Sequence, residues 1–179
     1  MKIYALFFLL IALISFAPLR AQSPQAWQDG DKPIAETDHM KSKAGFGAIL
    51  FLTDREKFFD DWNKPEPPNI SPLQKARRNV PIFTTILFVD PATDAMQRAK
   101  ITCYVIVHKP DGTVYGEEEL IGWDGKNTFP PHMLQLAQDR MGILIEPKDQ
   151  AGIYTVEATV RDEVKKVELQ LKSSFQVPE

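Results

Sequence analysis

The chain has 179 residues, a net charge of −3 at pH 7 and a single cysteine. A chain of this length predicts one domain plus a tail, and its mild acidity disfavours nucleic acid and anionic lipid as partners. A lone cysteine excludes an internal disulfide, so the core must be held by burial alone.

The first 21 residues have the pattern of a secretory signal peptide. Lys2 gives a positive start, residues 3–17 form an uncharged apolar run, and the segment ends on the small residue Ala21. The apolar run is shorter than the about 20 residues that a membrane-spanning helix needs, and Arg20 closes it. We therefore expect cleavage after Ala21, no stable membrane span in the mature protein, and a periplasmic or secreted location.

Residues 22–45 follow the signal peptide and contain few large apolar side chains. Gln, Asp, Lys, Ser and Pro dominate this segment, which predicts a flexible N-terminal lead-in. Trp27 is its one large aromatic residue, and we expect it to dock on its own domain. The folded domain is then expected to span residues 46–179.

The folded domain opens with an apolar run at residues 46–52, which predicts the first strand. Thr53 and Glu56 have the spacing of a capping box, which predicts a helix over residues 54–62. Phe58, Phe59 and Trp62 would form one apolar stripe on that helix, and the simplest role for the stripe is to cap an open end of the fold.

Apolar runs and alternating segments predict most of the remaining strands. They lie at residues 80–89, 100–108, 113–120 and 142–146. Residues 133–141 fit both a strand and a helix.

The clearest signal is at residues 153–177, where two alternating runs flank a polar turn, as in a half-buried antiparallel hairpin. A lone hairpin is marginal in water, so a second layer must cover its apolar face. Together the segments predict a mainly β chain: a single immunoglobulin-like antiparallel β-sandwich of about seven strands with one short helix.

A resemblance supports this architecture. Residues 146–154 read Glu-Pro-Lys-Asp-Gln-Ala-Gly-Ile-Tyr, and an alternating strand follows. The run resembles the late strands of bacterial immunoglobulin-like and macroglobulin-like domains, over residues 80–177. It implies a tyrosine corner, in which Gly152 precedes Tyr154 and the tyrosine hydroxyl bonds to upstream backbone. The cysteine pair and central tryptophan of antibody domains are absent, and the whole chain also resembles small exported proteins of Gram-negative bacteria.

No catalytic constellation is visible in the sequence. None of the serines sits in a Gly-x-Ser-x-Gly elbow. Cys103 lies on the apolar face of its predicted strand and His108 on the opposite face, which disfavours a Cys–His pair. The acidic run around Glu117 and Glu119 is interpreted as a solvated strand edge. We therefore expect a non-enzymatic protein without a cofactor.

Two His-Met pairs offer an alternative function. His39 with Met40 and His132 with Met133 supply imidazole and thioether groups, which suit copper in exported proteins. The pairs are far apart in sequence. A periplasmic carrier of a small ligand or of copper is therefore the alternative hypothesis.

Clustered aromatic residues support the leading hypothesis, a binding protein of the cell envelope whose partner is a protein or another envelope component. Phe58, Phe59, Trp62 and Trp123 are the candidate binding residues, because aromatic residues dominate interaction hot spots. This hypothesis predicts that Trp123→Ala abolishes partner capture and leaves the melting temperature nearly unchanged.

Overall fold

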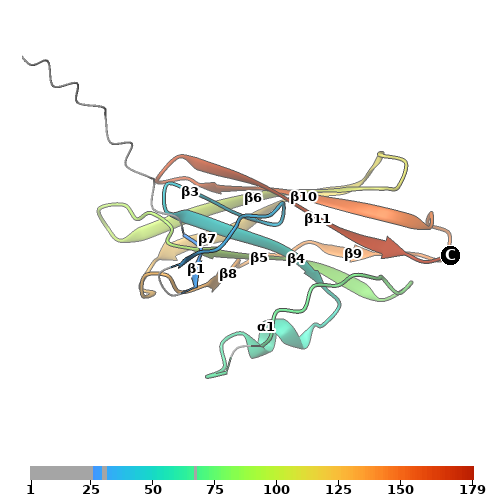
Figure 1. Cartoon of the computed structure of the whole chain (residues 1–179), viewed down its shortest axis with the longest axis horizontal. Helices are drawn as coiled ribbons and strands as arrows, with labels where there is room; N and C mark the ends of the chain where they lie inside the picture. Colours follow the sequence, from blue (N-terminus) through green and yellow to red (C-terminus); the bar gives the residue numbers. More distant parts are fainter. Residues whose placement is uncertain (1–25, 30–31, 67) are drawn as a thin grey trace, which may run out of the picture.

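The computed structural model describes residues 26–29, 32–66 and 68–179 (Figure 1). In this part of the chain two antiparallel sheets pack face to face, accompanied by a two-stranded ribbon and one short helix. The prediction of a mainly β sandwich with one short helix is therefore confirmed. The predicted signal peptide lies outside the described residues.

The first sheet has four strands in the order β11-β10-β6-β7. Their bounds are β6 (Arg98–His108), β7 (Val114–Lys126), β10 (Gly152–Asp162) and β11 (Val167–Val177). The predicted hairpin is β10 with β11, in which Tyr154 lies opposite Phe175 and Val160 opposite Leu169. These four side chains are buried, so the alternation in the sequence identified the core face of both strands.

The second sheet has five strands, with β3, β4 and β5 side by side and both β8 and β9 paired to β5. Their bounds are β3 (Met40–Lys43), β4 (Phe46–Thr53), β5 (Pro81–Val89), β8 (Gln135–Leu136) and β9 (Gly142–Leu144). The ribbon consists of β1 (Gln28–Asp29) and β2 (Lys32–Pro33).

Apolar side chains from the facing surfaces of the two sheets form one continuous core. Its largest fully buried members include Phe46, Leu50, Phe88, Ile101, Tyr154 and Phe175. Each such side chain contributes about 1.5–3 kcal/mol on removal from water, which explains how the fold holds without a disulfide.

The sandwich begins before residue 46, inside the segment that the sequence assigned to a flexible lead-in. Strand β3 pairs with β4 across a tight turn at Ala44 and Gly45, whose φ angles are 53° and 83°. Two positive φ angles in a two-residue loop are typical of a type I′ hairpin turn. The polar sequence of β3 carries no apolar alternation, which is why it was missed. Trp27 is buried against Ala26 and Val89, as expected for docking on its own domain.

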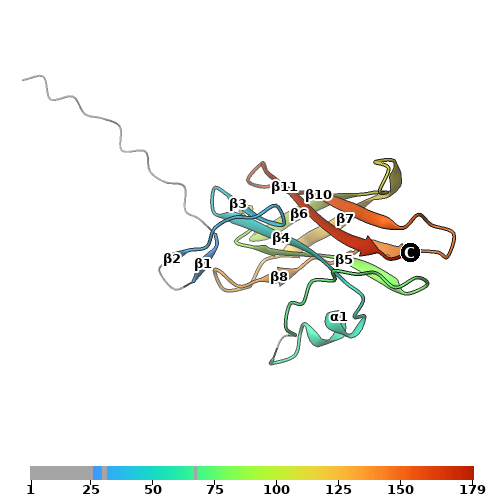
Figure 2. The same ribbon diagram turned by 45° about the vertical axis from the view of Figure 1, so that its right-hand side comes forward.

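The helix differs from its prediction in length, start and position. Helix α1 spans Lys57–Asp61, and its first turn has no side-chain cap. Thr53 belongs to β4, and its hydroxyl accepts from the backbone N–H of Arg55 at 3.2 Å, so the capping box does not form. Figure 2 shows α1 beneath the five-stranded sheet, where Phe58 packs against Phe51 of β4. The helix covers a sheet face, and the prediction that it caps an open end is wrong.

Gly152 and Tyr154 fix the loop that leads into β10. The Tyr154 hydroxyl donates to the carbonyl of Gln150 at 3.0 Å, which is the bond expected of a tyrosine corner. Gly152 has a φ of 137°, and a Cβ added there would lie 2.7 Å from Cγ of Pro110. Only glycine meets both requirements. No helix in the described ranges has the length and apolar character needed to cross a bilayer.

Candidate binding site

One pocket brings together aromatic residues that are far apart in the sequence. It lies between the end of α1, strand β7 and the segment around β8, and its volume is about 450 Å³. This size and an apolar lining are typical of small-molecule sites. We call it the aromatic pocket; it is lined by Trp62, Asn63, Lys64, Trp123, Phe129 and residues 133–138.

A β-bulge directs Trp123 toward this pocket. The pairing of β6 with β7 shifts register between Ile101 and Thr102, so that Trp123 lies opposite the buried Ile101. Without the extra residue, strict alternation would place Trp123 on the outer face of the sheet. The extra residue is Gly122, where a Cβ would lie 2.6 Å from Cγ2 of Ile101.

The Trp123 ring packs on both sides. Its centroid lies 6.4 Å from that of Phe88 and 5.4 Å from that of Phe129. Truncating this ring therefore removes core contacts as well as part of the pocket wall. This packing predicts that Trp123→Ala lowers the melting temperature, contrary to the expectation from the sequence.

The ambiguous segment at residues 133–141 closes the pocket from the other side. After the two residues of β8, the chain crosses from one sheet to the other. The Ala137 N–H donates to the carbonyl of Ile86 in β5, and the Gln138 N–H donates to that of Gly122 in β7, both at 2.9 Å. The segment is therefore extended at β8 and then bridges the two sheets, so the helical interpretation is wrong and the extended one holds only for the two residues of β8.

Trp62 directly follows α1; its side chain is half-buried, and its ring centroid lies 5.6 Å from that of Phe58. Phe58 is fully buried, and Phe59 packs against Phe83 and beneath the guanidinium of Arg140. The structure thus brings Trp62 and Trp123, two of the four candidate binding residues, to one pocket. Phe58 and Phe59 hold the helix on the sheet.

Two buried polar atoms of pocket-lining residues have no hydrogen-bond partner among the described residues. They are Oε1 of Gln135 and Nε1 of Trp123. Gln135 is only 4% exposed, and its Nε2 makes a long contact of 3.4 Å to Oδ1 of Asn127. A buried unsatisfied polar atom costs about 1–3 kcal/mol, so native proteins retain few of them. Sequence reasoning missed Gln135 and Phe129 because neither lies in a recognisable motif.

The pocket carries almost no charge. Lys64 is the single charged residue in its lining, and its ammonium group lies 2.5 Å from Oδ1 of Asp61. The hydrogen bond to Asp61 raises the pKa of Lys64, and the nearby carboxylate offsets its charge. The lining therefore suits a neutral ligand.

The candidate metal ligands are engaged elsewhere. Nδ1 of His132 lies 2.7 Å from a carboxylate oxygen of Asp90, and His39 contacts the hydroxyl of Thr37 at 3.2 Å. Met40 packs on the Trp27 cluster, whereas Met133 lines the aromatic pocket. Within the described ranges, no group of three or more His, Cys, Asp or Glu side chains is arranged to hold a metal ion.

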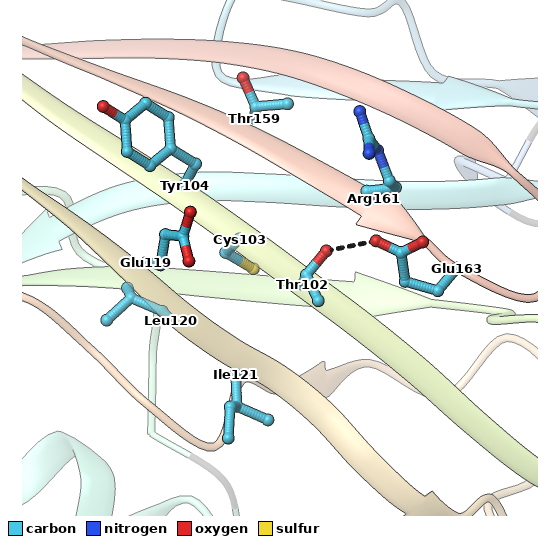
Figure 3. Close-up of a pocket in the computed structure, with 9 residues that line it drawn as sticks. All are labelled: Thr102, Cys103, Tyr104, Glu119, Leu120, Ile121, Thr159, Arg161 and Glu163. Carbon is cyan, nitrogen blue, oxygen red and sulfur yellow. Dashed lines mark hydrogen bonds between the residues drawn. The ribbon is translucent and has the colours of Figure 1, made fainter.

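A second hollow of about 570 Å³ lies on the outer face of the four-stranded sheet (Figure 3). Its lining includes Tyr104, Arg161 and the hydrogen-bonded pair Thr102–Glu163, whose oxygens are 2.8 Å apart. Cys103 borders it but is only 3% exposed, and burial raises the pKa of its thiol to about 12. The thiol is therefore protonated at neutral pH and unsuited to nucleophilic attack.

Comparison with known proteins gives no family for this chain. No family model matches it, and no curated protein matches it. Among solved structures it is similar to a family 123 glycoside hydrolase from Clostridium perfringens, with a TM-score of 0.43 and 13% identity over 74% of this chain and 27% of that one. It is also similar to a target of the Northeast Structural Genomics Consortium, with a TM-score of 0.35 and 16% identity over 75% of this chain and 86% of that one. Likenesses this distant carry no argument about function.

Proposed function

We propose that this chain is an exported, non-catalytic binding protein of the cell envelope, and that it holds an envelope component in the aromatic pocket. The observation that carries the proposal is the convergence of Trp62, Trp123, Phe129 and Met133 on one concave site. Large aromatic side chains and methionine supply contact area and are enriched where proteins bind partners. The pattern of residues 1–21 supports export.

The pocket mouth offers a variant that changes binding without disturbing the core. Met133 is 47% exposed, so Met133→Glu places a charge at the pocket mouth. The new carboxylate stays in contact with water, and the fold is therefore not destabilised by burial of a charge. Leu144 in β9 has the same exposure of 47% and does not line the pocket, which makes Leu144→Glu the matched control.

The test is co-sedimentation of the mature protein with an isolated cell-envelope fraction. We expect the wild type and Leu144→Glu to sediment with the envelope, and Met133→Glu to bind at least about tenfold more weakly, which corresponds to 1.4 kcal/mol. Equal sedimentation of all three proteins would contradict the assignment of binding to this pocket. Thermal melts of the three proteins would show that each is folded.

A carrier of a small ligand uses the same pocket, whose volume of about 450 Å³ accommodates one. The two functions differ in what is bound: a carrier binds a diffusible molecule, so its pocket would be occupied without sedimentation. The copper version gains no support from the positions of His39 and His132, because each is engaged with a neighbouring side chain.

A further inference from the structure

We infer that the ligand of the aromatic pocket is a carbohydrate, recognised through its hydroxyl groups by Gln135 and Trp123. This inference rests on the proposed binding function and names its ligand class. It starts from the two unpartnered atoms, the acceptor Oε1 of Gln135 and the donor N–H of Trp123. Both belong to residues that line the same pocket.

The two side chains are neighbours across Phe88. Gln135 lies directly opposite Phe88 in the pairing of β5 with β8, and the Trp123 ring packs on the Phe88 ring. A hydroxyl group both donates and accepts a hydrogen bond at a single oxygen. A ligand hydroxyl therefore matches either atom, since it can donate to the amide oxygen or accept from the indole N–H.

A peptide is a poorer match for the same pair of atoms. A backbone N–H only donates and a C=O only accepts, so a peptide needs a different group for each atom, whereas every hydroxyl of a sugar offers both functions. A charged ligand is also disfavoured, since Lys64 is the only charged residue of the lining and is paired with Asp61.

The walls of the pocket suit the rest of a sugar. Trp62, Trp123 and Phe129 supply apolar ring surface for the C–H groups of a pyranose, and Asn63 and Gln138 supply further amide groups for its hydroxyls. The two unpartnered atoms are closed off from solvent, so a ligand reaches them only when side chains of the lining move, and the flexible, half-exposed side chain of Met133 offers such a movement.

The indole N–H of Trp123 provides a direct readout. The experiment titrates the ¹⁵N-labelled mature protein with millimolar maltotriose, cellotriose and tri-N-acetylchitotriose, and with the tripeptide Ala-Phe-Ala. The spectrum records the indole N–H signals of the tryptophans. Trp27 is an internal control, because its Nε1 is also buried and unpartnered but Trp27 does not line the pocket.

At least one of the three sugars is expected to shift the Trp123 signal and leave that of Trp27 in place. Gln135→Met removes the acceptor and keeps the side-chain length. This variant is expected to bind that sugar at least about tenfold more weakly. Thr85→Val is the matched control, since the hydroxyl of Thr85 is buried and unpartnered but does not line the pocket. This variant is expected to bind as the wild type does.

The other outcomes overturn the inference in distinguishable ways. A Trp123 shift with the tripeptide and with no sugar would replace carbohydrate by peptide. No shift with any probe, together with envelope binding that Met133→Glu abolishes, would refute the ligand class and leave the pocket as the binding site. No shift with any probe, together with envelope binding that is the same for Met133→Glu as for the wild type, would refute both proposals.

Discussion

Gln135→Met should make the protein more stable, because the side-chain amide of Gln135 is buried and its oxygen lacks a hydrogen-bond donor within the described ranges. Its Oε1 has no partner among the described residues, and an unsatisfied buried acceptor costs about 1–3 kcal/mol. Methionine has nearly the same length and flexibility and carries no group that needs a partner.

The gain is reduced by what the variant loses. The Nε2 contact of Gln135 with Asn127 is 3.4 Å long, so its net contribution is at most about 0.5–1 kcal/mol. The expected increase in the free energy of unfolding is therefore about 0.5–2 kcal/mol. For a domain of this size each kcal/mol raises the melting temperature by about 2–4 °C.

Urea unfolding followed by tryptophan fluorescence, together with a thermal melt, measures the change. Thr85→Val removes another buried unpartnered hydroxyl at similar volume, and it should stabilise by a comparable amount. A loss of more than about 1 kcal/mol in Gln135→Met would refute the reasoning, because it would mean that the amide oxygen already has a stabilising partner. A gain in stability that accompanies a loss of binding is the trade-off expected at a functional site.

Three further changes test the framework around the pocket. Tyr154→Phe leaves the Gln150 carbonyl without its donor and should cost about 1 kcal/mol in urea unfolding; an unchanged midpoint would contradict the tyrosine corner. Asp162→Ala removes a buried carboxylate that accepts from three backbone N–H groups, and should cost at least about 3 kcal/mol in the same assay. The Tyr115 hydroxyl lowers the pKa of Asp149 below 3.8, so this stabilisation is present above that pH and is lost as the pH falls further. Tyr115→Phe should therefore flatten the decline of the melting temperature below about pH 4, and an unaltered decline would refute the coupling.

The parts of the fold that follow from sequence are those with strong local patterns. The alternation in residues 153–177 identified the core face of β10 and β11, and the motif around Gly152 identified the corner that begins β10. Strand β3 was not predictable in this way, since its pairing depends on β4 and on a turn formed by Ala44 and Gly45. The capping box failed because the sheet keeps Thr53 in β4, where backbone pairing overrides the local signal.

The candidate site was only partly visible from the sequence, because its members meet through the tertiary fold. Trp62 and Trp123 stood out as aromatic residues, but nothing local places the residue that follows α1 beside a residue of β7. The bulge at Gly122 decides which way Trp123 faces, and a single extra residue in a strand leaves little trace in the sequence. The polar atoms of Gln135 became informative only once their lack of partners was known.

The measurement that tests the central claim most directly is site-specific photo-crosslinking in intact cells. A photoreactive amino acid replaces Met133 at the aromatic pocket in one variant and Leu144 on β9 in the other, two positions of equal exposure. The account predicts a crosslinked envelope component from position 133 and none above background from position 144. Equal yields from both positions, or a product from position 144 alone, would contradict the claim that the protein binds through this pocket.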